Sequence, residues 1–156
     1  MRALAVVLCC AGCAGVSPSL WSPPGTHVYV APFVDQTPGM RLGMAMTTSL
    51  QDRLYARAPD RFLVVFDDAA VAVDGTVIAV EDVHADRGKR DVIVKAELAL
   101  VDKRGRVRHE TGIVERRARY ETSADVTENA RRRDAALAIA TSTVGRALAD
   151  LILRVP

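Results

Sequence analysis

The chain has 156 residues, of which 49% are hydrophobic and 26% are charged, and its formal net charge is +2. This length and composition suit one domain with a hydrophobic core. Twenty-one basic and nineteen acidic residues give a surface of mixed charge, which argues against nucleic acid as a partner.

The first thirteen residues have the pattern of a bacterial lipoprotein export signal. Arg2 precedes an apolar run at 3–10, and two small residues, Ala11 and Gly12, then lead to Cys13. The run is shorter than the roughly 20 residues that a membrane span needs, and we expect no span later in the chain. We therefore predict a signal peptide over 1–12 and acylation of Cys13. The alternative is an ordinary signal peptide in which the cysteine is incidental.

All three cysteines of the chain, Cys9, Cys10 and Cys13, lie in this leader, so we expect no disulfide in the mature protein. Cys10 and Cys13 have a Cys-x-x-Cys spacing, but the predicted cleavage separates them. Residues 14–26 are rich in proline, serine and glycine and carry no charge. They predict a lipidated tether over 13–26, followed by a domain over 27–156.

The domain begins with a predicted strand, helix and strand. Residues 27–34 are apolar at both odd and even positions, which favours a strand that is covered on at least one face. Thr37-Pro38 has the pattern of a helix cap followed by a first-turn proline, and the apolar residues after it recur at four-residue spacing. This predicts a helix over about 38–58. A short buried strand is expected over 61–66.

A long hairpin is predicted next, with its turn near Gly88. Its second strand alternates, so that Lys95 and Glu97 face away from the core. The apolar residues at the even positions face the core: Val92, Val94, Ala96, Leu98 and Leu100. A second turn at 103–105 leads into a strand that is expected to reach about Tyr120, with a bulge at Gly112.

The last predicted element is an amphipathic helix over about 126–153, with a capping box formed by Asp125 and Glu128. Its predicted apolar stripe consists of Leu137, Ala140, Val144, Leu148, Leu151 and Val155. The order of elements predicts an α+β fold, a two-layer sandwich with two helices packed on one face of a mixed, mostly antiparallel four- to five-stranded sheet.

The sequence shows no arrangement typical of a catalytic or metal site. The histidines, His27, His84 and His109, lack ligand spacing, and we expect them to be structural. The adjacent carboxylates Asp67-Asp68 and Glu81-Asp82 point to opposite sides of an extended chain, so neither pair can work as acid and base together. We attribute these pairs to a turn and a strand end. We expect a protein that is not an enzyme and that needs no metal or cofactor.

Basic residues gather at three places where phosphate could bind. The clusters are Arg87, Lys89 and Arg90 at the first turn, Lys103, Arg104, Arg106 and Arg108 at the second, and Arg131-Arg132-Arg133 on the last helix. Arginine suits phosphate because its planar fork donates two parallel hydrogen bonds. The alternative is that hairpin turns and exposed helical turns are simply solvated.

Taken in order, these motifs resemble the LPS-assembly lipoprotein (LptE) family over about residues 27–154. The resemblance rests on the strand and Pro-Phe exit at 28–37, the Asp-Gly-Thr strand opening at 73–77, the long hairpin and the C-terminal helix, all behind a lipobox. Two positions depart from the family: Asp35 stands where asparagine is common, and Ala14 follows the cysteine in place of glycine.

The resemblance implies a lipoprotein on the periplasmic face of the outer membrane, anchored through Cys13. Such a protein plugs the lumen of the barrel protein LptD, helps to assemble it and takes part in delivering lipopolysaccharide. The resemblance implies a phosphate contact at Arg87. The family's second basic residue, shortly before the last helix, has no clear match here, although Arg131 lies close by. Lys89 and Arg90, in the same basic cluster as Arg87, are further candidates.

A different class remains open, the outer-membrane interaction modules of the LpoB and CsgG type, which activate a peptidoglycan synthase or form a secretion ring. The tether of about 13 residues spans at most roughly 45 Å, which is short for a regulator that crosses the periplasm, and the long hairpin suits a plug. A periplasmic domain with a purely structural role is a third possibility.

Overall fold

The computed structural model describes residues 27–63 and 69–155. The predicted signal peptide and lipidation site, the tether and the Asp67-Asp68 pair lie outside the described residues.

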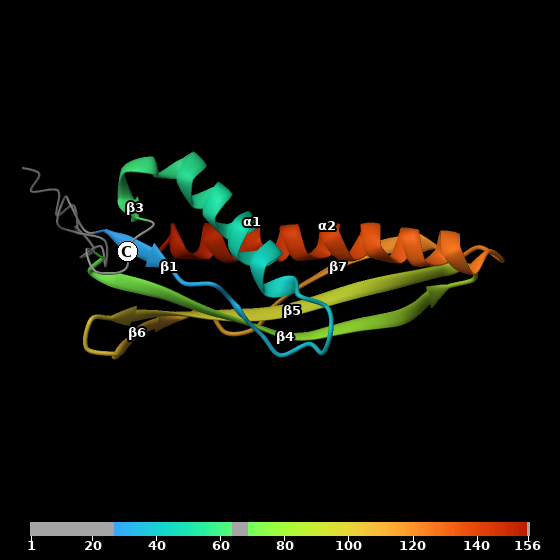
Figure 1. Cartoon of the computed structure of the whole chain (residues 1–156), viewed down its shortest axis with the longest axis horizontal. Helices are drawn as coiled ribbons and strands as arrows, with labels where there is room; N and C mark the ends of the chain where they lie inside the picture. The colour runs from blue at the N-terminus through green and yellow to red at the C-terminus, as the bar shows by residue number, and fades with distance from the viewer. Residues whose placement is uncertain (1–26, 64–68, 156) are drawn as a thin grey trace, which may run out of the picture.

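The described chain forms one mixed sheet and two helices (Figure 1). The strands are β1 (Val28–Val30), β2 (Val34–Asp35), β3 (Phe62–Leu63), β4 (Val71–Asp86), β5 (Lys89–Asp102), β6 (Val107–Glu110) and β7 (Val114–Glu121). The helices are α1 (Leu42–Arg57) and α2 (Val126–Ile152), with a 3-10 turn at Pro59–Arg61. The sheet order is β3-β1-β4-β5-β6, with β2 beside β4 and β7 beside β5. Strands β1 and β2 share one edge of β4, and β6 and β7 share one edge of β5, so the sheet is five strands wide. The predicted α+β fold, with two helices and a mixed sheet, is confirmed.

The β4–β5 hairpin is the longest feature of the sheet and agrees with its prediction. Its turn lies at Arg87-Gly88, where Gly88 has a φ of 73°, a conformation that glycine adopts without strain. The even-numbered apolar residues of β5 are all buried, and Glu97 is exposed. The alternation in the sequence therefore identified the face of β5 that meets the core.

Two predicted strands are interrupted. The first breaks into β1 and β2 around Pro32, where the main-chain N–H of Phe33 donates to the Thr47 hydroxyl (2.9 Å) instead of joining a ladder. The strand expected to reach Tyr120 breaks into β6 and β7, and Gly112 has a φ of 66° between them. The predicted bulge at Gly112 is therefore a break between two strands.

Helix α1 starts at Leu42, four residues later than predicted, and Thr37 does not cap it. Gly39 and Arg41 have φ values of 77° and 51°, which end any earlier helical turn. The carboxylate of Asp35 instead accepts hydrogen bonds from the main-chain N–H groups of Leu42 and Gly43. A side chain outside the helix thus satisfies donors that an N-cap residue normally serves.

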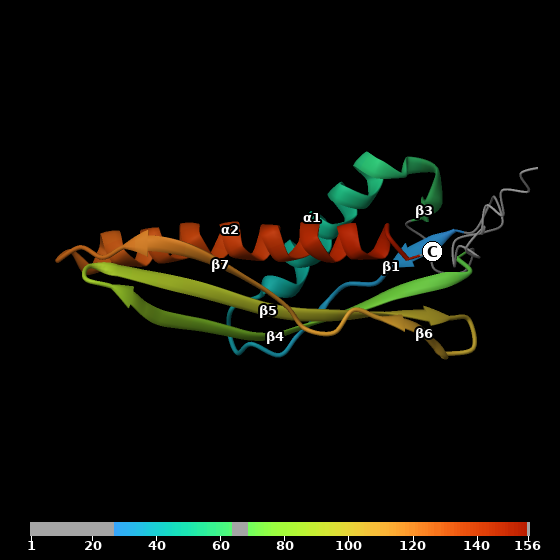
Figure 2. The same cartoon turned by 180° about the vertical axis from the view of Figure 1, so that it is seen from behind.

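Helix α2 packs along β5 and β7, and α1 packs mainly against α2 (Figures 1 and 2). Ala140, Val144 and Leu148 of the predicted stripe have no exposed surface. Leu151 was wrong as a core position, because it is 36% exposed while Ile152 is fully buried. The buried face is thus rotated slightly from the predicted one at the C-terminal end.

We expected no segment after the leader to be long and apolar enough to span a membrane, and by length and composition this expectation was wrong. Helix α2 is long and apolar enough to cross a bilayer, with a mean hydropathy of 1.4 over its most apolar window. Half of that window is buried inside the domain, as in the core helix of a folded domain.

The domain is elongated, and its two ends differ (Figure 1). The first described strand and the end of α2 lie at one end, together with the β5–β6 turn. The Arg87-Gly88 turn and the start of α2 lie at the opposite end. A chain attached through residues preceding His27 therefore carries the Arg87-Gly88 turn at the end remote from its attachment.

Candidate ligand-contact surface at the hairpin tip

We call the end of the domain formed by residues 86–90, the 122–125 turn and the first two turns of α2 the hairpin tip. The main-chain N–H of Thr122 donates to the carbonyl of Gly88 over 2.8 Å. This bond joins the β4–β5 turn to the connection between β7 and α2. Residues far apart in sequence therefore meet in one surface (Figures 1 and 2).

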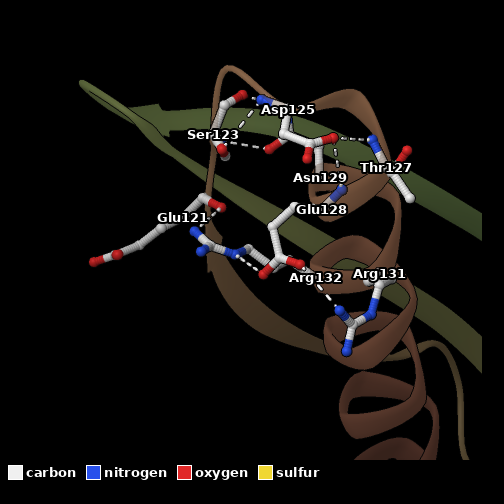
Figure 3. A network of polar contacts seen from close by, with 8 residues as sticks. All are labelled: Glu121, Ser123, Asp125, Thr127, Glu128, Asn129, Arg131 and Arg132. Carbon is white, nitrogen blue, oxygen red and sulfur yellow. Dashed lines mark hydrogen bonds and ion pairs between the residues drawn. The ribbon is translucent and has the colours of Figure 1, made fainter.

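Side chains hold the connection between β7 and α2 in place (Figure 3). The amide of Asn129 accepts a hydrogen bond from the N–H of Ser123 and donates one to the carbonyl of Ser123 (2.6 Å). Asp125 caps the helix by accepting from the N–H groups of Thr127 (2.8 Å) and Glu128 (3.3 Å). The predicted cap at Asp125 is therefore confirmed.

The second half of the predicted capping box was wrong. The N–H of Asp125 donates to the Ser123 hydroxyl (3.2 Å), so Glu128 does not reach back to it. Glu128 instead accepts from Arg132 (2.8 Å) and Arg131 (3.3 Å). The hydrogen bond from Arg132 outweighs burial and lowers the pKa of the Glu128 carboxyl.

Asp82 accepts hydrogen bonds from three side chains near the start of α2. Its carboxylate accepts from the guanidinium groups of Arg90 (2.7 Å) and Arg133 (3.0 Å) and from the Tyr120 hydroxyl (2.9 Å). A register shift after Val77 places Asp82 opposite Val92 on the inner face of the sheet. Burial alone would raise the pKa of Asp82, but the hydrogen bonds from Arg90, Tyr120 and Arg133 hold it below its usual value.

Glu81 and Asp82 lie on opposite faces of β4, as predicted, since Glu81 pairs with Lys95 while Asp82 pairs inward. The explanation by a strand end was wrong, because β4 continues to Asp86. Sequence reasoning missed Asp82 as the centre of a polar cluster. The available signal was a carboxylate in the middle of a strand, where an unpaired charge is costly.

Three of the four candidate phosphate contacts, Arg87, Lys89 and Arg131, lie at the hairpin tip and do not pair with Asp82. Arg87 is exposed, and within residues 27–63 and 69–155 neither Arg87 nor Lys89 has a carboxylate at salt-bridge distance. The Arg131 side chain is 79% exposed, although it touches Glu128. Arg90 is bound to both the carboxylate and the carbonyl of Asp82, so it is the least available of the four.

The second basic cluster is a self-contained turn at the other end of the domain. Asp102 accepts from the main-chain N–H groups of Arg104 (2.8 Å) and Arg106 (3.0 Å) and pairs with the side chains of Arg106 (2.9 Å) and Arg108 (2.7 Å). The main-chain bond from Arg106 is the largest of several hydrogen bonds that lower the pKa of Asp102 well below its usual range. Here Arg106 and Arg108 neutralise a turn aspartate, and the basic pattern of the sequence did not reveal this pairing.

The described residues offer no metal-binding arrangement: no group of three His, Cys, Asp or Glu side chains in this part of the chain could hold an ion. His27, His84 and His109 lie before β1, on β4 and on β6, respectively. Nδ1 of His27 is buried without a hydrogen-bond partner among the described atoms.

No protein-family model and no curated protein matches the sequence, whereas several solved structures share the fold. A putative lipoprotein from Caulobacter crescentus is 16% identical, with a TM-score of 0.56 over 81% of this chain and 85% of that chain. A minor lipoprotein from Acinetobacter baumannii is 10% identical, with a TM-score of 0.58 over 82% and 90%. The PelC dodecamer from Paraburkholderia phytofirmans is 12% identical, with a TM-score of 0.58 over 87% and 93%. The chain therefore has a fold that occurs in bacterial lipoproteins.

Proposed function

We propose that this chain is an outer-membrane lipoprotein, anchored through Cys13 on the periplasmic face, that plugs an LptD-type barrel, helps to assemble it and takes part in lipopolysaccharide transport. The observation that carries this proposal is the hairpin tip, where Arg87 and Lys89 lie without ion pairs among the described residues. Unpaired cations on a turn suit the phosphates of lipopolysaccharide.

Two further features support the proposal. The fold is shared with solved proteins described as lipoproteins, which agrees with the lipobox at residues 2–13. The domain is elongated, with the tip at the end opposite β1 (Figure 1). A chain tethered by its N-terminus therefore presents the tip away from the anchor. The proposed role requires binding and no chemical reaction, so we assign no catalytic residue and no cofactor.

The test is affinity purification of the tagged full chain from detergent-solubilised outer membrane, with Cys13→Ser as the unlipidated control. We expect a large barrel protein in stoichiometric amount with the wild type and much less with Cys13→Ser. Arg87→Glu should keep the barrel but reduce the lipopolysaccharide that is recovered. A preparation without any barrel protein contradicts the plug.

A second candidate is an interaction module of the LpoB or CsgG type that forms a ring or binds a synthase. The observation in its favour is the fold shared with the PelC dodecamer. The same purification separates the two candidates. A ring of copies of this chain, measured by light scattering, or a recovered peptidoglycan synthase would favour the module over the plug.

A further inference from the structure

Asn129 connects two segments of the hairpin tip, and both ends of its amide are used. Its Oδ1 accepts from the N–H of Ser123 and its Nδ2 donates to the carbonyl of the same residue (2.6 Å) (Figure 3). These two bonds, to the N–H and the carbonyl of one residue, fix the orientation of the amide. They hold the connection after β7 against the first turn of α2.

This connection is bonded in turn to the β4–β5 turn. Thr122, which precedes Ser123, donates its N–H to the carbonyl of Gly88 over 2.8 Å. Arg132 adds a bond from its guanidinium to the carbonyl of Glu121 (3.3 Å). An uninterrupted series of contacts therefore runs from Asn129 to the turn that carries Arg87.

The basic residues of the tip lie at the two ends of this series. Arg87 precedes Gly88 on the hairpin, and Arg131 follows Asn129 by two residues on α2. We propose that Asn129 is a positioning residue that holds Arg87 and Arg131 in a fixed relative arrangement, so that both contact the phosphates of one lipopolysaccharide molecule. This inference rests on the proposed function.

The physical reason is preorganisation. The end of a long hairpin frays easily, because few contacts hold it. If the basic side chains of the tip must become ordered when the lipid binds, the entropy lost in that ordering weakens the affinity for the lipid. Aspartate at this position keeps the size and the acceptor of asparagine but lacks the donor for the carbonyl of Ser123. Asn129→Asp therefore removes one of the two bonds without opening a cavity, and it also places a negative charge beside the carbonyl of Ser123.

The experiment measures the affinity of the full lipidated chain, in detergent, for purified lipopolysaccharide and for the same lipid stripped of its phosphates. We expect Arg87→Gln to weaken binding about tenfold, as for the loss of a charge-assisted contact, and Asn129→Ala about fivefold through lost preorganisation. In the Asn129→Ala background, Arg87→Gln should weaken binding only about twofold, because coupled residues are not additive. Asn129→Asp should also weaken binding, because it loses the bond to the carbonyl of Ser123 and repels the phosphates.

Arg53→Gln is the matched control, because it breaks an ion pair between α1 and α2 (2.9 Å to Asp150) outside the tip. It should lower stability and leave the affinity unchanged. Multiplicative effects of Arg87→Gln and Asn129→Ala would overturn the positioning role while leaving the proposed function intact. Equal affinity of the two lipids for the wild type, with no effect of Arg87→Gln, would instead reject the phosphate contact and the inference that rests on it.

If Asn129→Ala does not fold, the exchange of the Thr122 amide hydrogen in Asn129→Asp decides the point. Faster exchange than in the wild type supports the positioning role of Asn129, and unchanged exchange rejects it.

Discussion

Arg133 of α2 and Asp82 of β4 are 51 residues apart in the sequence, yet the Nε and Oδ2 atoms of the pair are 3.0 Å apart. The same carboxylate binds Arg90 of β5 and Tyr120 of β7. One acidic side chain therefore links α2 to three neighbouring strands. This cluster lies next to the hairpin tip, and the bond from Arg133 to Asp82 holds the N-terminal part of α2 against the sheet.

Removal of Asp82 should destabilise the domain more than removal of its neighbour. Asp82→Ala leaves Arg90, Arg133 and Tyr120 without their acceptor, and its side chain is only 20% exposed. We expect the free energy of unfolding to fall by about 1–3 kcal/mol. Glu81→Ala is the matched control in the same strand. Its pair with Lys95 is more exposed, and its loss should cost less than about 1 kcal/mol. Urea denaturation measures both, and equal losses would contradict the role of Asp82.

The stability of the domain should fall in acid. The pKa values of Asp35, Asp82 and Asp150 are all lowered in the folded chain, by hydrogen bonds that outweigh burial. A carboxyl whose pKa is lower in the folded state stabilises the fold above its unfolded value, near pH 4, and that contribution is lost as the pH falls through the folded value. Unfolding curves between pH 7 and pH 2 should show this loss. Asp82→Asn should reduce the loss of unfolding free energy between pH 7 and pH 2. A pH dependence identical to that of the wild type would contradict a lowered pKa at Asp82.

Local patterns in the sequence were enough to predict the hairpin and the cap of α2. The alternation at 92–100, the glycine at 88 and the aspartate at 125 each report on a few neighbouring residues, and period and turn chemistry act at that range. The resemblance to a lipoprotein family agrees with the fold, and its finer functional consequences stay predictions.

Long-range pairing could not be predicted from the same patterns. The start of α1 depends on a carboxylate seven residues before it, and the availability of Arg90 depends on Asp82 across the hairpin. At the tip, the side chain of Asn129 bonds to the main-chain N–H and carbonyl of Ser123 and so determines the path of the chain. Such contacts are set by the packed structure, so a basic cluster read from sequence does not reveal which cations are already neutralised.

Asp35 should stabilise the start of α1 although it lies outside the helix. Asp35→Ala removes the acceptor for the N–H groups of Leu42 and Gly43 and should cost about 0.5–2 kcal/mol of unfolding free energy, as for loss of an N-cap. Asp35→Asn keeps an acceptor oxygen and should retain most of the stability. Asp52→Ala, at an exposed position of α1, should change the stability by less than about 0.5 kcal/mol. Thermal unfolding compares the three, and an Asp35→Ala protein as stable as Asp52→Ala would contradict this cap.

Gly145 should be required for the close approach of the two helices. A Cβ at this position would lie 2.9 Å from Cβ of Ser49 and 3.1 Å from the carbonyl oxygen of Met46. Neither atom is at the end of a flexible side chain, so α1 must move away from α2. Alanine has an intrinsic helical advantage over glycine of about 1 kcal/mol, yet we expect Gly145→Ala to lower the unfolding free energy by about 1–3 kcal/mol through overpacking.

The compensating change separates the clash at Gly145 from any general effect on α2. Ser49→Gly removes one of the two obstructing atoms, so the double variant should be more stable than the sum of the single effects predicts. Ala138→Gly, at an exposed position of α2, gives the propensity difference alone. If Gly145→Ala proves more stable than the wild type by that same amount, the helices are free to separate, and the contact between Gly145 and Ser49 does not limit their packing.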